Sequence, residues 1–317
     1  MMNLPKLTDI DVAGKRVLLR LDLDTNPDPS DLRIKASKET VEYLHSKNSK
    51  VIIIGHKGRP DGKVDESLSL KPFESLFPDC EIKENLRFNP GEETNDEAYA
   101  HEIASWGDVF VNDAFASSHR AHASIVGVPK FLPHAIGLHF ALEIEHLENV
   151  FENPKRPLIF LISGAKEDKI SYITKFEEIA DKVLVGGRLP DMLGDRGLES
   201  VRTQNGKVIV GNLGMDKEDI TLNTIERFEK EISEANTIVV SGPLGKFEDT
   251  GHRQGTERVV KAVAMSHATK IAGGGDTEAA LKLFGVIDSF DWVSVGGGAM
   301  LEFLSKKSLP GIEALLK

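Results

Sequence analysis

The sequence predicts an α/β protein with two doubly wound parallel-sheet lobes joined by a long interdomain helix. Short runs rich in Val, Ile and Leu alternate with amphipathic segments along most of the 317 residues. Continuous apolar strands separated by helices indicate parallel sheets covered on both faces. The length favours two domains, and an amphipathic helix expected at 138–150 divides the chain nearly in half.

In the first half, the apolar runs predict three strands and the intervening periodicity predicts three helices. The strands are expected at 16–21, 50–54 and 108–111, and the helices at 36–45, 70–77 and 95–106. The second half repeats the alternation, which makes both lobes Rossmann-like. Its strands are expected at 158–162, 182–185, 207–210, 237–240, 270–272 and 292–294, and its helices at 169–180, 222–232, 256–265, 277–284 and 312–316.

Composition excludes several classes of protein. Apolar residues make up 40% and charged residues 28%, which is typical of a soluble globular chain. No apolar run is long enough for a membrane span, and the N-terminus lacks the pattern of a signal peptide. The single cysteine, Cys80, permits no internal disulfide and no multi-cysteine zinc site, so we expect a cytoplasmic protein. A net charge of -11 argues against nucleic-acid binding.

Cationic side chains recur at predicted strand ends, or in the loops after them, throughout the first half. Since the strand ends of a parallel sheet meet at one edge, these side chains can form one pocket for an anion. Arginine suits that role because its planar fork grips carboxylate or phosphate with two bonds. For any single arginine, the alternative is a solvated surface charge. The candidates are Arg33, Arg59 with the adjacent His56, Arg87 and Arg120. His119 and His122 are as compatible with turn or packing roles.

Glycine-rich turns follow the predicted strands of the second half. A strand, a glycine turn and a helix start expose backbone N–H groups that bind phosphate. Five such turns in one lobe point to a polyphosphate or a nucleotide. Neither a P-loop motif nor a clear G-x-G-x-x-G fingerprint is present. The turns begin at Gly164, Gly186, Gly242, Gly273 and Gly296.

Charged residues near these turns are candidates for nucleotide contacts. Asp276, at a helix start, can hold a magnesium ion carried by the nucleotide; alternatively it is an N-cap. Lys166 and Lys169 flank the first turn and can neutralise phosphate. Glu248 can accept ribose hydroxyls, or it can be a solvated loop carboxylate.

Taken in order, these motifs resemble phosphoglycerate kinase along nearly the whole chain. The first half carries RVLLRLD at 16–22, GHKGRP at 55–60, ENLRF at 84–88, and NDAF at 112–115 with HRAH at 119–122. The second half carries GAK at 164–166, SGP at 241–243, GGGDT at 273–277, GGGA at 296–299 and LPGI at 309–312. The 112–122 and 273–277 blocks are the most specific of these motifs.

The resemblance implies a substrate lobe at 1–137, an interdomain helix and linker at 138–156, and a nucleotide lobe at 157–305. The segment at 306–317 is expected to pack back on the first lobe. The expected partners are small molecules alone, with no nucleic acid and no membrane, and we expect a monomer. The 3-phosphoglycerate contacts fall on Asp22, Asp24, Arg33, His56, Arg59, Arg87 and Arg120. The contacts to ATP or ADP fall on Gly164, Lys166, Lys169, Gly187, Ser241, Glu248, Gly273, Gly274, Gly275, Asp276 and Thr277, with Asp276 as the ligand of Mg²⁺.

The implied reaction is the glycolytic phosphoryl transfer between 1,3-bisphosphoglycerate and ADP, which gives 3-phosphoglycerate and ATP. Both nucleophiles are ionised at neutral pH, so no general base is needed. Alignment and charge neutralisation carry the reaction. The residues assigned to that task are Arg33, Lys166, and the helix N-termini at Gly275 and Gly298.

Some positions depart from the family pattern. Asp24 and Ser241 stand where the family has asparagine, Val295 stands in place of a threonine, and Lys166 and Lys169 lie one residue closer than usual. The chain is also shorter than usual between 77 and 84 and between 193 and 219. These departures favour an alternative, a catalytically weak or inactive relative that binds an anionic metabolite or nucleotide in a regulatory or scaffolding role.

Overall fold

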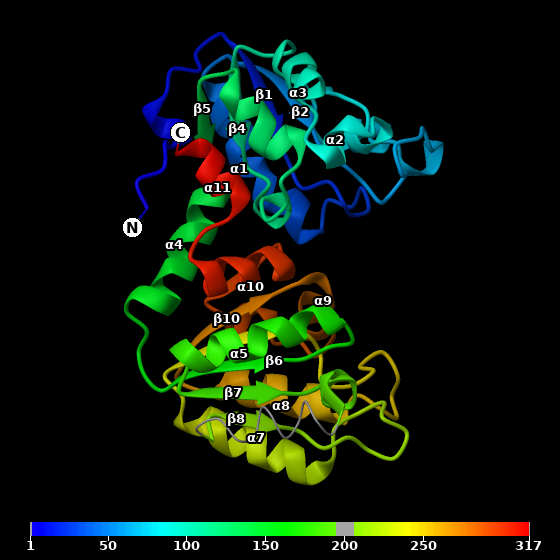
Figure 1. Cartoon of the computed structure of the whole chain (residues 1–317), viewed down its shortest axis with the longest axis vertical. Helices are drawn as coiled ribbons and strands as arrows, with labels where there is room; N and C mark the ends of the chain where they lie inside the picture. Colours follow the sequence, from blue (N-terminus) through cyan, green and yellow to red (C-terminus); the bar gives the residue numbers. More distant parts are fainter. Residues whose placement is uncertain (1, 195–205, 317) are drawn as a thin grey trace. The chain divides into compact units, whose positions relative to one another are not determined.

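The structure, a computed structural model, describes residues 2–194 and 206–316 (Figure 1). The chain forms two compact units. Unit 1 comprises Met1–His146 and Lys306–Lys317, and unit 2 comprises Leu147–Ser305. The boundary falls inside helix α4, Leu138–Glu152. Among the described residues, no helix is both long and apolar enough to cross a membrane.

Unit 1 is built on a parallel sheet with the strand order β3-β2-β1-β4-β5. The chain leaves β1 in one direction to form β2 and β3, and later in the other direction to form β4 and β5. The order therefore reverses beside β1, and ligands of such sheets bind outside the carboxyl ends of the strands at this point. The strands are β1 Arg16–Arg20, β2 Lys50–Ile54, β3 Glu81–Ile82, β4 Val109–Asn112 and β5 His134–Ile136.

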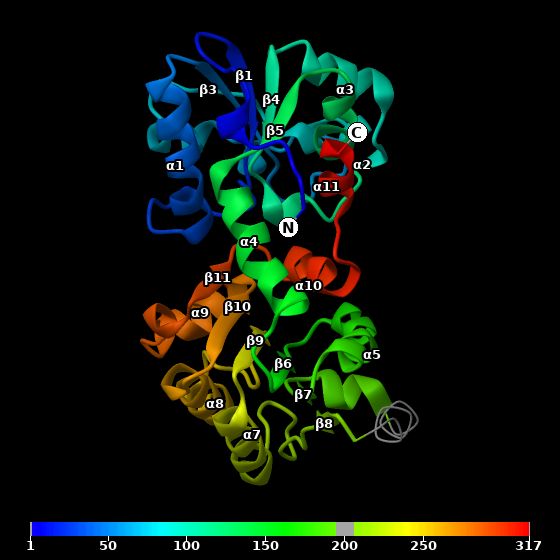
Figure 2. The same ribbon diagram turned by 90° about the vertical axis from the view of Figure 1, so that its left-hand side faces the viewer.

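Helices lie on both faces of the unit 1 sheet, with α1 on one side and α3 on the other (Figure 2). Alternate strand residues such as Val17 and Leu19 face α1 and join Ile34 and Leu44 in one buried cluster. The α-helices are α1 Leu32–Ser46, α2 Gly91–Thr94, α3 Glu97–Ala104 and α11 Pro310–Leu315. The other helical segments are η1 Leu7–Asp9, η2 Glu66–Leu68, η3 Lys71–Leu76, η4 Leu86–Phe88, η5 Phe115–Ser117, η6 Ala123–Gly127 and η7 Val128–Lys130.

Unit 2 is also built on a parallel sheet whose strand order reverses once. The order is β11-β10-β9-β6-β7-β8. Here the order reverses between β6 and β9. Residues Ile159, Leu161 and Val240 face α7 and α8, whereas Phe160 stacks on Phe176 of α5 with ring centroids 4.1 Å apart. The strands are β6 Leu158–Ile162, β7 Lys182–Val185, β8 Val208–Val210, β9 Thr237–Ser241, β10 Thr269–Gly273 and β11 Trp292–Ser294. The helices are η8 Glu167–Lys169, α5 Ile170–Ile179, α7 Leu222–Glu234, α8 Gln254–Met265, α9 Gly275–Leu283, η9 Ile287–Ser289 and α10 Gly297–Lys306.

The predicted fold class is confirmed, but several elements differ from the sequence prediction. Helix α1 begins at Leu32 because the Asp31 side chain caps it by accepting from the Arg33 N–H at 2.8 Å. Arg33 therefore lies in the first turn of a helix, and its placement in a strand-end loop was wrong. The segment expected as an α-helix at 70–77 is the 3₁₀ helix η3, with Pro72 at its start. Strands β3 and β5 were not predicted.

Candidate functional site

Three of the four candidate arginines lie around one pocket of unit 1. Arg59, Arg87 and Arg120 line a cavity of about 290 Å³. Asp61, Glu93 and His122 complete its lining. The loop after β2 supplies Arg59 and the turn η4 supplies Arg87, as expected for strand ends at one edge. The cavity concentrates positive charge at the switch point of the sheet.

Arg87 is fixed by its neighbours. Its Nη1 donates to the Gly58 carbonyl at 2.6 Å, and its Nε lies 3.2 Å from Glu93 Oε1. Burial lowers the pKa of Arg87 from its ordinary value, and the Arg120 charge lowers it further. The guanidinium nevertheless stays charged at neutral pH, because arginine is protonated far above it.

His122, which lines the cavity, and His56, which does not, are both neutral at physiological pH. Burial, followed by the nearby arginine charges, holds the pKa of His56 well below its usual value and lowers that of His122 to about 3. The Nη2 of Arg20 lies 2.8 Å from His56 Nδ1. Arginine only donates, so His56 Nδ1 accepts and its proton sits on Nε2. His56 is thus a neutral donor behind the arginines.

Beneath this pocket, the sequence analysis missed a buried polar network. Arg20, fully buried on β1, donates from Nε to Ser124 Oγ at 3.0 Å and from Nη1 to the Leu21 carbonyl. Ser124 Oγ in turn donates to the buried Glu92 at 2.6 Å. A charged residue inside an apolar strand was the available signal, because a buried charge needs partners.

The remaining unit 1 candidates shape the loops around the cavity. Asp22 accepts from the Ala116 N–H at 2.7 Å and from Ser117 Oγ at 2.5 Å, so it holds the loop after β4. Asp24 accepts from the Gly58 N–H at 2.8 Å, and its carbonyl accepts from Arg33 Nη1. Arg33, His56, Asp22 and Asp24 are not among the residues that line the cavity.

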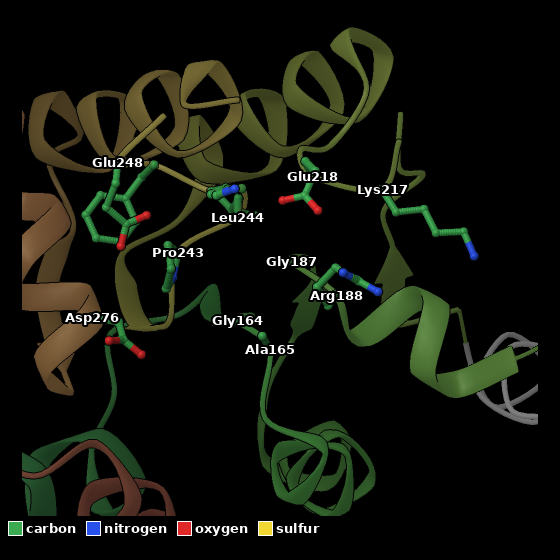
Figure 3. A pocket seen from close by; sticks show the side chains of 13 residues that line it. Gly164, Ala165, Gly187, Arg188, Lys217, Glu218, Pro243, Leu244, Glu248 and Asp276 are labelled. Carbon is green, nitrogen blue, oxygen red and sulfur yellow. The ribbon is translucent and has the colours of Figure 1, made fainter. Parts of the chain in front are cut away.

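Unit 2 has a pocket of about 310 Å³ at the carboxyl ends of its strands (Figure 3). Four predicted nucleotide contacts line it: Gly164, Gly187, Glu248 and Asp276. The bare backbone at the turns is required, because a Cβ on Gly187, which has φ 61°, would lie 2.4 Å from Gly164 N. The rest of the lining is Ala165, Arg188, Lys217, Glu218, Pro243, Leu244, Gly245, Lys246 and Phe247.

Two helices begin at the glycine turns of unit 2. Helix α9 starts at Gly275 and α10 at Gly297, which places Gly298 in its first turn. A Cβ on Gly275 would meet no atom of the described residues within 4 Å, so these residues leave space open there. The Asp276 carboxylate has no hydrogen bond to any described residue and lines the pocket. An open helix start with a carboxylate fits a phosphate that carries a hard cation.

Lys169 and Thr277 tie these turns together. Lys169 Nζ donates to the carbonyls of Ser163 at 2.8 Å and Ser241 at 3.1 Å, and it lies 3.2 Å from Ser241 Oγ. Burial, and then the charge of Lys166, lowers the pKa of Lys169 to about 8. Thr277 Oγ1 accepts from the Gly242 N–H at 2.8 Å and donates to the Gly273 carbonyl at 2.9 Å. Lys166, Lys169, Ser241, Thr277 and the glycines at 273–275 do not line the pocket itself.

The chain is similar to known proteins over almost its whole length. The sequence profile of the family described as phosphoglycerate kinase matches residues 7–79, 79–193 and 197–307. A phosphoglycerate kinase of Solibacter usitatus is 36% identical, and the match covers 99% of this chain and 100% of that protein. One of Coprothermobacter proteolyticus is 34% identical, with 99% of each covered.

Solved structures give the same result. The phosphoglycerate kinase of Coxiella burnetii matches with a TM-score of 0.83 and 30% identity, and the match covers 99% of each chain. That of Pyrococcus horikoshii also matches with a TM-score of 0.83, at 25% identity, with 98% of each chain covered. Matches that cover both partners nearly completely favour the enzyme over a shortened, inactive relative.

Proposed function

This chain belongs to the phosphoglycerate kinase family, and from that premise we propose which of its residues carry the reaction. The protein is an ATP-dependent phosphotransferase with a carboxyl group as acceptor. It transfers a phosphoryl group reversibly between 1,3-bisphosphoglycerate and ADP, giving 3-phosphoglycerate and ATP. The observation that carries the residue assignment is a cationic pocket in unit 1 together with a glycine-lined pocket in unit 2.

The unit 1 cavity is the proposed site of 3-phosphoglycerate. Arg59, Arg87 and Arg120 bind its phosphate and carboxylate, since guanidinium groups pair with both in two-bond geometry. His56 does not line the cavity. In its neutral state it accepts a hydrogen bond from Arg20, which orients that arginine, and it adds no further positive charge. Asp22 and Asp24 keep the loops of the pocket in place, and Asp24 positions Arg33 through its carbonyl.

The unit 2 pocket is the proposed site of the magnesium-bound nucleotide. Gly164 and Gly187 provide bare backbone, and Glu248 accepts the ribose hydroxyls. Asp276 is the protein ligand of the magnesium ion that arrives with the nucleotide. No group of three or more His, Cys, Asp or Glu side chains in the described segments could hold a metal by itself. One carboxylate with phosphate and water is the coordination that Mg²⁺ prefers.

Charge neutralisation is the proposed catalytic task. The attacking oxygen is already ionised, so no side chain needs to remove a proton. We assign the neutralisation of the developing charge to Lys166 and the first turns of α9 and α10, at Gly275 and Gly298, in the nucleotide lobe, and to Arg33 in the substrate lobe. Lys169 holds the turns that present those N–H groups, with Ser241, Thr277, Gly273 and Gly274 as its framework.

We further propose a cytoplasmic monomer that acts on small molecules without nucleic acid or membrane. The single cysteine supports a reducing compartment, and the net charge of -11 disfavours nucleic acid.

A coupled assay with 1,3-bisphosphoglycerate and MgADP tests the proposal. We expect ATP formation by the natural chain and a loss of at least a hundredfold in kcat in Arg33→Ala. Nucleotide affinity, measured by calorimetry, should change less than threefold. Arg227→Ala, an exposed position on α7, removes the same charge as a control. Unchanged turnover in Arg33→Ala would refute the role of that residue.

A further inference from the structure

Unit 1 has a second cavity, which shares a wall with the acid pocket, the proposed site of 3-phosphoglycerate. The volume of this second cavity is about 420 Å³, within the range of small-molecule sites. Arg120 and His122 line the acid pocket, whereas Ala121, between them, lines the second cavity. The backbone of His122 is extended, with φ -90° and ψ 157°, and successive side chains of an extended backbone point to opposite sides. This short segment therefore separates the two cavities.

The rest of the second cavity is formed by η6, η7, β5 and the C-terminal helix α11. Helix α11 lies beside β5 (Figure 2). Four lining residues are apolar: Val126, Pro129, Pro310 and Ala314. Pro129 is buried and the other three are half-buried. An apolar group that enters the cavity leaves water and gains these contacts, so the cavity suits a ligand with an apolar side chain.

Three polar side chains line the same cavity and have binding capacity to spare. Lys130 and Glu313 are exposed, and neither side chain has a hydrogen bond or ion pair to any described residue. His134 Nδ1 lies 2.9 Å from the Leu132 carbonyl, which only accepts, so Nδ1 carries the proton. In the neutral ring, Nε2 then presents a lone pair. The cavity thus offers one cationic donor, one anionic acceptor and one neutral acceptor.

This set of groups matches a zwitterion better than a ligand with one charge. A ligand ammonium has three donors, which Glu313 and His134 Nε2 can accept, and a ligand carboxylate accepts from Lys130. A simple carboxylic acid would leave Glu313 without a counter-charge, and a simple amine would leave Lys130 without one. An α-amino acid carries both charges on one carbon, together with a side chain for the apolar lining.

We propose that this cavity binds a free α-amino acid with a large apolar side chain, and that the bound amino acid strengthens the binding of 3-phosphoglycerate. The ligand fills the space behind Ala121 and holds the shared segment, so Arg120 is in position before the acid arrives. Such preorganisation raises affinity because less ordering remains to be done on binding. The amino-acid site stands apart from the proposed function, whereas its effect on affinity rests on the proposed 3-phosphoglycerate site.

Calorimetry on the complete protein with L-leucine tests the cavity directly. We expect saturable binding of L-leucine. L-leucinamide lacks the carboxylate, 4-methylpentanoate lacks the ammonium and glycine lacks the apolar side chain. Each of these three compounds should bind at least tenfold more weakly than L-leucine.

Variants of the two charged side chains locate the bound leucine. Lys130→Met and Glu313→Gln should each weaken leucine binding at least tenfold. Lys35→Met and Glu39→Gln remove the same charges from exposed positions on α1, away from the cavity, and should bind leucine like the natural protein. Absence of leucine binding, or leucine binding that Lys130→Met and Glu313→Gln leave unchanged, would overturn the inference.

A titration of 3-phosphoglycerate with and without saturating L-leucine tests the coupling. We expect leucine to lower the Kd for 3-phosphoglycerate at least threefold in the natural protein and to have no effect in Lys130→Met. By reciprocity, 3-phosphoglycerate should strengthen leucine binding by the same factor. Leucine that bound among the arginines would compete with the acid, so an unchanged or raised Kd would overturn the inference. Failure of 3-phosphoglycerate to bind at all would contradict the proposed function, and the leucine titrations would still test the cavity.

Discussion

At the scale of single residues, the environment of a charge decides its role more than its type does. Arg59 and Arg87 line the same cavity, yet Arg59 is exposed and Arg87 is held by Gly58 and Glu93. Lys166 is exposed, whereas Lys169, three positions later, is half-buried and donates to two backbone carbonyls. A lowered pKa follows from that burial, because leaving water disfavours the charged amine.

The half-buried Lys169 predicts a pH dependence on the nucleotide side. Its pKa is lowered to about 8 by burial and Lys166, and is raised again by Asp276 and Asp168. The amine is charged below that pH and neutral above it. We expect kcat/KM for the nucleotide to fall as pH rises through about 8, since this ratio reports the free enzyme. In Lys169→Arg the side chain stays charged, so kcat/KM for the nucleotide should stay constant to higher pH than in the natural protein. Identical pH profiles for the two proteins would contradict the assignment of this pH dependence to Lys169.

Arg20 and Glu92 predict a coupled effect on stability. Removing either charge leaves the other buried without its counter-charge, which costs about 3–5 kcal/mol. Arg20→Met and Glu92→Gln should each lower the free energy of urea unfolding by about that amount. The double variant should lose less than the sum, by roughly 0.5–3 kcal/mol. Additive losses would show that the chain Arg20–Ser124–Glu92 carries no coupling.

At the scale of elements, local sequence signals predicted the long strands and failed for short or capped ones. The β-branched run of β2 predicts a buried strand without ambiguity. Strand β3 has two residues and β5 has three, directly after Pro133, so neither offers a readable period. The start of α1 was missed because the cap at Asp31 was not recognised, and Arg33 was misplaced as a result.

The same contrast holds for the candidate site. Glycine turns and strand-end arginines were predictable, since they belong to local patterns. The burial of Arg20 and the framework role of Thr277 depend on contacts distant in sequence. Ser124 lies 104 residues from Arg20, and Gly242 lies 35 residues from Thr277. No local pattern reports such pairs.

Removing the N-cap of α1 should lower turnover as well as stability, whereas removing an N-cap elsewhere should lower stability alone. Asp31 caps the helix that carries Arg33, and it also accepts from Thr25 Oγ1 at 2.5 Å. Asp31→Ala should cost about 1 kcal/mol of stability and lower kcat, because Arg33 loses its position. Asp96→Ala removes the corresponding cap of α3, which accepts from the Tyr99 N–H. Asp96→Ala should lose a similar amount of stability and keep its kcat unchanged. Equal kcat values in the two variants would exclude the connection between the Asp31 cap and the position of Arg33.

At the scale of the whole molecule, unit 1 is assembled from both ends of the described chain. Helix α11 packs on η6, and the Gly311 N–H donates to the Ser118 carbonyl at 2.9 Å. A Cβ on Gly311 would lie 2.8 Å from Ser118 Cβ, so the two backbones approach closely. Ser118 precedes His119 and Arg120 in the loop that supplies the acid pocket. The last residues of the fold therefore support the site formed by residues almost two hundred positions earlier.

This arrangement predicts that the C-terminal helix affects one substrate and not the other. Ile312 is fully buried in unit 1, whereas Leu316 is 54% exposed. Ile312→Ala should destabilise unit 1 by about 2–5 kcal/mol and raise KM for 3-phosphoglycerate several-fold through Ser118 and Arg120. Nucleotide affinity, a property of unit 2, should stay the same in calorimetry. Leu316→Ala, the matched truncation at an exposed position, should change neither. If Ile312→Ala instead weakened both substrates equally, the helix would act on the protein as a whole rather than on the acid pocket it supports.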